Sequence, residues 1–256
     1  MFSFRNTTIL FFILLVVLLI AVFAWSIPVY VVILLVALYC ILSFSASFFI
    51  GSGFYMDAIC SIKTEEKIIS ITFDDGPDPF VTPGILDILK DKAKGTFFCI
   101  GKKIAGNEEI IRRIDAEGHL VGTHSYSHSF WFDFFTSQSM REEFIHTEDI
   151  VFSIISKRPK FFRPPYGVIN PTVKLALRSF NYHVTGFSNR SLDTSLRNDD
   201  KIFRRVIRNL KPGDIILFHD TVKETLPALE KLLIFAEEEG FRFLRLDELT
   251  QLKAYA

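Results

Sequence analysis

The chain has 256 residues, with 29 basic and 29 acidic side chains, so it has room for one sizeable domain and a smaller unit. Its charges are unevenly placed, because Arg5 is the only charged residue before Asp57. The remainder is nearly neutral and shows no basic cluster, which argues against a nucleic-acid partner. Three cysteines lie far apart without a Cys-x-x-Cys pair, so neither a disulfide framework nor a thiolate metal site is indicated.

The amino-terminal region contains two long apolar runs, at about residues 7–25 and 29–50. Each is close to the length that crosses a bilayer, and Pro28 suits a tight turn between them. We therefore expect residues 1–56 to be a retained cell-membrane anchor of two transmembrane helices and residues 57–256 to be a soluble domain. A cleaved signal peptide is the alternative, but Arg5 alone is a thin positive region and no small-x-small site closes the first run.

The side of the membrane on which the soluble domain lies depends on very few charges. Arg5 precedes the predicted hairpin, and Lys63 and Lys67 follow it. The positive-inside rule places both ends, and the soluble domain, in the cytoplasm. A single kinked crossing reverses this orientation, so the side stays open.

From residue 68 onward, β-branched or aromatic runs alternate with amphipathic ones. Strands are predicted at residues 68–73, 95–100, 119–123, 160–163, 182–187 and 214–218, and helices at 82–92, 107–117, 137–156, 170–180, 199–210 and 224–239. Segments 241–244 and 247–252 finish the chain. The alternation predicts an α/β fold, a deformed (β/α) barrel of about seven parallel strands, preceded by a membrane-spanning helical hairpin.

The first predicted strand stops at two adjacent carboxylates, Asp74 and Asp75, and Gly76-Pro77 then forces a turn. Sites in α/β folds are built at the carboxyl ends of strands, so this pair suggests one metal ligand and one base. A solvated Asp-Gly turn is the alternative.

Two histidines, His124 and His128, follow another predicted strand. One turn of helix places such residues on one face, which is a metal-chelating spacing. Alone, they are more simply two exposed histidines. Combined with an acid at another strand end, they predict a site of two histidines and one aspartate with open positions for water and substrate.

Two further predicted strands end at residues that suit a role in catalysis. Arg163 is followed by Pro-Pro-Tyr-Gly, in which two prolines stiffen the backbone and leave the amides of Tyr166 and Gly167 as fixed donors for an oxyanion. His219 ends a buried strand, and its unperturbed pKa of about 6.5 suits proton donation to a leaving amine. The alternatives are a plain rigid loop with Arg163 in a salt bridge, and a core histidine satisfied by the backbone.

These stretches together resemble, in order, four motifs of the polysaccharide deacetylase family of carbohydrate esterases, also called the NodB homology domain. They are Thr72-Phe-Asp-Asp-Gly-Pro77, His124-Ser-x-x-His128, Arg163-Pro-Pro-Tyr-Gly167 and Leu217-Phe-His219. The resemblance covers about residues 66–250. Four ordered matches, each at a predicted strand end, make the joint signal specific.

The resemblance implies a role for each matching position. Asp75, His124 and His128 would hold a divalent metal, usually Zn²⁺, with Co²⁺, Ni²⁺ or Mn²⁺ as alternatives. Asp74 would be the general base that takes a proton from water.

The other matching positions would assist the reaction. Arg163 would orient Asp74, and the Tyr166 amide would help bind the oxyanion. Leu217 would line the pocket for the acyl methyl group, and His219 would protonate the departing amine.

One family segment departs from the usual pattern. After the fifth strand the family often has an acid-x-x-acid-Trp sequence whose acid tunes the catalytic histidine. Here Asp193 matches the second acid, whereas Arg190 replaces the first acid and Thr194 replaces the tryptophan. Arg190 would lower the pKa of His219 or bind an anionic group of the substrate, unless it points away into solvent.

The expected function is a metal-dependent hydrolase of carbon–nitrogen bonds other than peptide bonds. It would remove N-acetyl or other N-acyl groups from amino sugars of a polysaccharide such as peptidoglycan or a chitin-like glycan. A deformylase or deacylase of a lipid-linked amino sugar is one alternative, favoured by the hairpin and Arg190. An inactive carbohydrate-binding relative is another. The expected partners are the N-acylated glycan or lipid-linked sugar and the membrane, and no protein partner is inferred.

Overall fold

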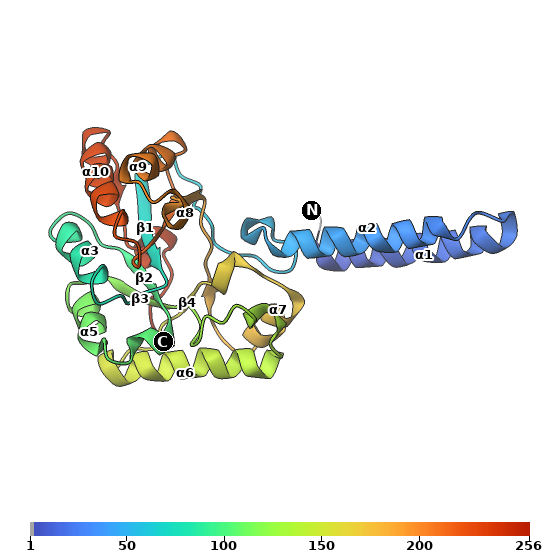
Figure 1. The fold of residues 1–256 in the computed structure, drawn as a ribbon, viewed down its shortest axis with the longest axis horizontal. Coiled ribbons are helices and arrows are strands. Elements are labelled where there is room, and N and C mark those ends of the chain that lie inside the picture. The colour runs from blue at the N-terminus through green and yellow to red at the C-terminus, as the bar shows by residue number, and fades with distance from the viewer. Residues whose placement is uncertain (1–2) are drawn as a thin grey trace.

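A computed structural model describes residues 3–256 and shows a helical hairpin that projects from one side of an α/β body (Figure 1). The hairpin consists of α1 (Phe4–Trp25) and α2 (Tyr30–Ser47). A hydrogen bond of 2.8 Å between the hydroxyls of Thr8 and Tyr39 joins the two helices. Both helices are long and apolar enough to cross a membrane, and only 6% of each apolar stretch is buried. They are therefore not core helices of the body.

The body is built on one sheet, in which the described strands follow the order β5-β4-β3-β2-β1-β7-β6 and β8 pairs with β1. All pairings between these strands are parallel. The strands are β1 (Ile68–Asp74), β2 (Thr96–Cys99), β3 (Leu120–Thr123), β4 (Phe161–Phe162), β5 (His183–Val184), β6 (Asn189–Arg190), β7 (Ile215–His219) and β8 (Arg242–Phe243). Because the path ends at β5 and β6, the sheet is a half-barrel, and the predicted deformed barrel of about seven parallel strands is confirmed.

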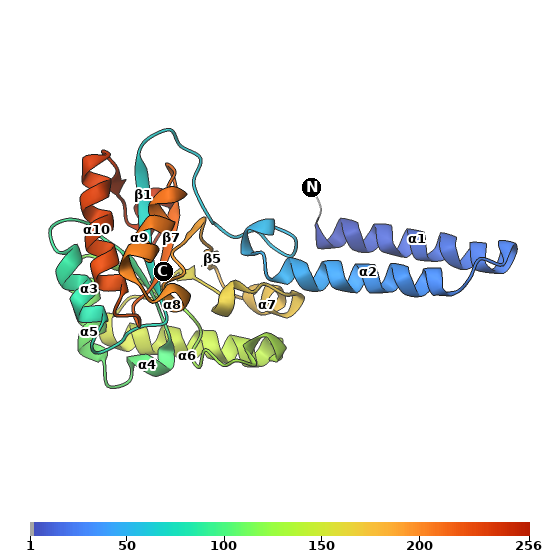
Figure 2. The same cartoon turned by 45° about the horizontal axis from the view of Figure 1, so that its top comes forward.

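Helices cover the outside of the sheet (Figures 1 and 2). They are α3 (Thr82–Leu89), α4 (Gly101–Ile104), α5 (Glu108–Ala116), α6 (Ser137–Ile155), α7 (Pro171–Leu177), α8 (Asp193–Leu196), α9 (Asp199–Arg208), α10 (Thr225–Glu238) and α11 (Leu246–Thr250). The sequence interpretation missed α4, α8 and β6. Each is only two to four residues long, too short to show a hydrophobic period.

Strand β1 shows how the sheet separates packing from chemistry. Its side chains alternate between two faces, and Ile69, Ile71 and Phe73 pack into the core beneath the outer helices. The intervening residues, which include Thr72 and Asp74, are also buried and belong to the other face. That face is the interior of the half-barrel. The alternation therefore places Asp74 inside the barrel at the carboxyl end of the strand.

The junction between hairpin and body is packed rather than loose. Ile50, Phe54 and Tyr55 belong to one buried cluster with aromatic and aliphatic residues of the body. The Phe4 amide donates to the Phe54 carbonyl at 2.8 Å, and the Ile169 amide donates to the Ser47 carbonyl at 3.0 Å. The hairpin consequently leaves the body beside α7 (Figure 2).

Candidate active site

Asp74 is held by a buried arginine from a different strand end. Arg163, which follows β4, is 1% exposed and donates from Nη1 to Asp74 Oδ1 at 2.7 Å. The same nitrogen donates to Thr72 Oγ1 at 2.8 Å, and Nη2 donates to the Gly186 carbonyl at 2.7 Å. With its donors committed, the guanidinium is fixed in place and holds the Asp74 carboxylate in one orientation.

Asp75, His124 and His128 meet beside this pair. One ligand atom from each lies within 4.8 Å of the others. Asp75 Oδ1 is 3.6 Å from Nε2 of His124 and 3.3 Å from Nε2 of His128. Nδ1 of His124 donates to the Arg163 carbonyl at 2.7 Å, which leaves its Nε2 lone pair facing the carboxylate. Two imidazoles and one carboxylate are a donor set that fits Zn²⁺ and similar divalent ions.

The expectation that one turn of helix aligns the two histidines is wrong. The segment between them is a loop, and Ser125 and His128 have φ angles of 61° and 47°. The His128 amide donates to Ser125 Oγ at 3.1 Å, which closes the loop on itself. Glu143 of α6 accepts from the amides of Tyr126 and Ser127 at 3.0 and 2.7 Å. The loop brings the imidazole centroids to 4.8 Å from one another.

Glu143 is therefore a positioning residue that sequence reasoning missed. In the sequence it is one of several charged residues along a helix, and no signal marks it.

The protonation states suit metal ligation. Burial lowers the pKa of His128 to about 4, and the neighbouring His124 acts in the same direction. Burial raises the pKa of Asp75, but the nearby groups His124, His128, His219 and Lys103 together outweigh this and hold it below its ordinary value. A neutral imidazole and an ionised carboxylate are the forms that bind metals.

His219 lies across the site at the end of β7, in register with Asp74. Its Nδ1 donates to Asp193 Oδ1 at 2.7 Å. Asp193 Oδ2 accepts from the His219 amide at 2.7 Å and from Thr225 Oγ1 at 2.9 Å. Burial lowers the pKa of His219, but the hydrogen bond and charge of Asp193 outweigh it, so the pKa lies above its ordinary value. The net shift is opposite to the lowering expected from Arg190, because Asp193 dominates.

Asp193 lies in α8, and Thr225 begins α10. Sequence reasoning matched the first to a family position and missed the second, which no local pattern distinguishes.

One cavity of about 190 Å³ is lined by Asp74, Asp75, His124, His128 and His219. Leu217, Tyr166 and Arg190 also line it. Arg190 on β6 pairs in register with Leu217, and its guanidinium carbon lies 5.9 Å from the centre of the Phe187 ring. Arg190 therefore borders the cavity rather than pointing away from it. Within residues 3–256, no carboxylate lies at ion-pair distance from Arg190.

The loop after Arg163 presents Tyr166 to the cluster of Asp75, His124 and His128. Tyr166 has a φ of 58°, and its ring centroid lies 4.7 Å from that of His128. The Gly167 amide donates to the Pro164 carbonyl at 3.1 Å, so the expectation that it is free for an oxyanion is wrong. The Tyr166 amide remains the candidate donor.

The chain matches the family model described as polysaccharide deacetylase over residues 61–185. It is 35% identical to a peptidoglycan-N-acetylglucosamine deacetylase of Bacillus cereus over 198 residues. The aligned region covers 75% of this chain and 92% of the relative. It is 33% identical to a peptidoglycan-N-acetylglucosamine deacetylase of Listeria monocytogenes over 205 residues, 78% of this chain but 42% of that longer protein.

Among solved structures, a peptidoglycan N-acetylglucosamine deacetylase in complex with a naphthyl N-hydroxybenzamide superposes with a TM-score of 0.73. Its sequence identity to this chain is 33%, over 78% of this chain and 95% of the other. The chain belongs to the polysaccharide deacetylase family. The deacetylases of this family are divalent-metal-dependent hydrolases of carbon–nitrogen bonds, and the Asp75, His124 and His128 cluster is the place in this chain that fits such an ion.

Asp220, next to His219, supports the turn that carries Asp75. It is buried, and its Oδ2 accepts from Thr82 Oγ1 at 2.7 Å. A Cβ atom at Gly76 would come within 1.9 Å of that oxygen, so only glycine fits there. Burial raises the pKa of Asp220 to about 7. Sequence reasoning assigned this residue no role.

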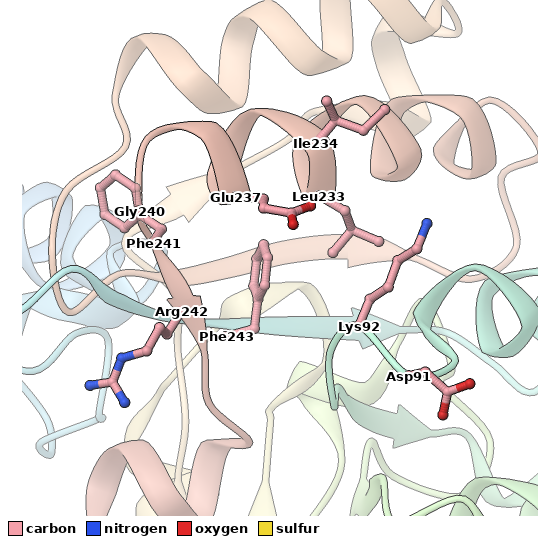
Figure 3. A pocket seen from close by; sticks show the side chains of 9 residues that line it. All are labelled: Asp91, Lys92, Leu233, Ile234, Glu237, Gly240, Phe241, Arg242 and Phe243. Atoms are coloured by element: carbon pink, nitrogen blue, oxygen red, sulfur yellow. The ribbon is translucent and has the colours of Figure 1, made fainter.

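A second, larger cavity of about 510 Å³ lies at the other end of β1, between α10, β8 and the turn after α3 (Figure 3). Asp91 and Lys92 line one wall, and Glu237 and Phe243 are on the opposite elements. Ile68, the first residue of β1, pairs with Arg242, so this cavity is at the amino end of the strand. Volume alone therefore does not mark the active site. The converging titratable groups at the carboxyl ends of the strands do.

Proposed function

We propose that this deacetylase is a membrane-anchored, metal-dependent N-deacetylase of amino sugars in a cell-wall glycan such as peptidoglycan. The observation that carries the proposal is the arrangement around one cavity. Asp74, paired with the buried Arg163, and His219, paired with the buried Asp193, lie on either side of a cluster of two histidines and one aspartate that fits a metal ion. The two curated relatives described above act on peptidoglycan N-acetylglucosamine, which supports this substrate class.

Asp75, His124 and His128 would hold the cation, for which Zn²⁺ is the first choice and Co²⁺, Ni²⁺ or Mn²⁺ are alternatives. A divalent cation at such a site lowers the pKa of water and polarises the acyl carbonyl. Asp74 takes the proton from the attacking water as general base. Arg163 donates a hydrogen bond to Asp74 and directs its carboxylate into the cavity.

His219 completes the hydrolysis by donating a proton to the leaving amine. Because Asp193 accepts from Nδ1, the Nε2 of His219 is the nitrogen that serves the cavity. The Tyr166 amide donates to the oxyanion of the tetrahedral intermediate. Leu217 lines the space for the acyl methyl group.

Residues 1–56 are proposed to anchor the catalytic domain, residues 57–256, in the cell membrane. The outward-facing apolar side chains of both helices support this assignment over a role in the core of the body. Polymer deacetylation requires the domain outside the cytoplasm, against the orientation that the few flanking charges favour.

A second candidate is deacylation or deformylation of a lipid-linked amino sugar. The observation that favours it is Arg190, a cation at the cavity rim with no acidic partner in the described chain, which suits a phosphate or carboxylate of the substrate.

Acetate release by the full chain in detergent tests the proposal. Peptidoglycan and chitooligosaccharides are offered to untreated, chelator-treated and zinc-restored protein, with Asp74→Asn as the matched inactive control. We expect release that chelation removes and zinc restores. No release from folded, zinc-loaded protein would redirect the assay to lipid-linked sugars. Failure there as well would leave the inactive carbohydrate-binding relative.

A further inference from the structure

A dense aromatic run follows the metal-binding loop. Residues 129–136 read Ser-Phe-Trp-Phe-Asp-Phe-Phe-Thr. Phe132 is fully buried, whereas Phe130, Trp131 and Phe134 are 75%, 61% and 79% exposed. We call these three residues the aromatic loop. Exposing three neighbouring large rings to water costs free energy, and such an exposed apolar patch indicates an interaction site.

The aromatic loop lies next to the point where the hairpin leaves the body. The Ile169 amide bonds the carbonyl of Ser47, the last residue of α2. The next residue, Asn170, donates from its side chain to the Asp133 carbonyl at 2.9 Å, between Trp131 and Phe134. Two hydrogen bonds thus connect the end of α2 to the aromatic loop through the start of α7.

The nearest part of the chain continues the same apolar surface. Phe48 and Phe49, directly after α2, are 55% and 67% exposed. In Figure 2 the hairpin leaves the body beside α7, on the side away from α10. Exposed aromatic rings therefore surround the base of the hairpin.

We propose that Phe130, Trp131 and Phe134 insert into the interfacial layer of the bilayer spanned by the hairpin. This inference rests on the proposed membrane anchoring. Aromatic rings are enriched at the interfacial depth, and the aromatic loop continues the apolar surface of the hairpin. The loop begins two residues after His128, so the insertion holds the active-site loop at the membrane surface, where it meets membrane-proximal glycan.

The ring geometry favours a bilayer over a glycan as the occupant. Phe130 and Trp131 cross at 83° with centroids 5.1 Å apart, and Trp131 and Phe134 cross at 60° and 5.9 Å. A sugar stacks on a flat aromatic face, whereas these rings point their edges in different directions. Lipid tails and headgroups adapt to such a surface. Asp133, the only charge in the run, is half-buried and therefore does not oppose insertion as an exposed carboxylate would.

The two tryptophans of this chain, Trp25 and Trp131, provide the test. Trp25 lies at the hairpin turn and reports on anchoring, and Trp131 reports on the aromatic loop. Full-length Trp25→Phe and Trp131→Phe proteins are reconstituted into phosphatidylcholine vesicles with or without lipid brominated near the top of the acyl chains. A matched control carries Ile234→Trp in the protein that lacks both natural tryptophans. Ile234 is 57% exposed on α10, on the far side of the body from the hairpin (Figure 1).

We expect brominated lipid to quench Trp131 several-fold more than the tryptophan of the Ile234→Trp control, with Trp25 also quenched. Quenching of Trp25 alone would overturn the inference while leaving the anchoring intact. Absence of quenching at both positions would overturn the anchoring and with it the inference. If chitooligosaccharide, but not brominated lipid, changes Trp131 fluorescence, the aromatic loop is a glycan platform and the inference is wrong.

Discussion

The two sides of the cavity that are proposed to handle protons, at Asp74 and at His219, are built alike. Asp74 and His219 occupy neighbouring strand ends in register, and each is paired with an opposite charge from a residue outside its own strand. Arg163 fixes the position of the Asp74 carboxylate through a hydrogen bond, whereas Asp193 raises the pKa of His219, which suits an acid. The proposed base and the proposed acid thus lie on different sides of one small cavity.

The largest expected effect comes from removing the base itself. Asp74→Asn should lower kcat by about 10²–10⁴-fold, because the water proton loses its acceptor. Bound zinc, measured by elemental analysis, should stay at the wild-type level, since Asp74 lies outside the metal cluster.

The matched variant is His128→Ala, which should lose both zinc and activity. Retention of metal and turnover by purified His128→Ala would contradict the ligand assignment.

Disrupting the pair of Arg163 and Asp74 should lower the stability of the protein as well as its activity. Arg163→Met leaves a buried, unpaired carboxylate at Asp74, which costs about 3–5 kcal/mol of stability. The thermal unfolding midpoint of the detergent-solubilised chain should fall accordingly. Adding Asp74→Asn should recover a large part of the midpoint but none of the activity. If the double variant is no more stable than Arg163→Met alone, the two side chains are not energetically coupled.

Disrupting the pair of His219 and Asp193 should change the dependence of activity on pH. Asp193 raises the pKa of His219, and a general acid works only while protonated, so activity is lost as pH rises through that pKa. Asp193→Asn should therefore move the alkaline limb of kcat/KM to lower pH and reduce kcat. Thr225→Val removes one hydrogen bond donated to Asp193, which makes that carboxylate a stronger acceptor for His219, so the limb should move slightly, to higher pH. If the Asp193→Asn variant keeps the wild-type alkaline limb, His219 is not the general acid whose deprotonation causes that limb.

The smallest effect is expected at the rim, where neither proton-handling pair is touched. Arg190→Gln should raise KM roughly tenfold for a substrate with a carboxylate or phosphate next to the reacting sugar, the worth of one charged hydrogen bond. For neutral chitooligosaccharides KM should stay near the wild-type value. Equal changes for both substrates would show that Arg190 acts on the fold of the cavity wall and not on an anionic group.

The sequence by itself determined those features that are written in adjacent residues. The apolar runs predict the two helices of the hairpin, and a buried strand that stops at Asp74 and Asp75 places both carboxylates at the sheet edge. Strand–helix alternation likewise predicts the parallel half-barrel. These signals are local, because hydrophobic period and turn chemistry act within a few residues.

Tertiary structure decided how the remaining groups meet. His124 and His128 converge through a loop that Glu143 holds from α6, and a helical turn is not involved. Asp193 reaches His219 only because α8 packs against the end of β7, although the two residues are 26 positions apart. The aromatic loop borders the hairpin through Asn170, although Asn170 and Asp133 are 37 positions apart. Such contacts depend on where whole elements pack, and no local pattern of residues encodes that placement.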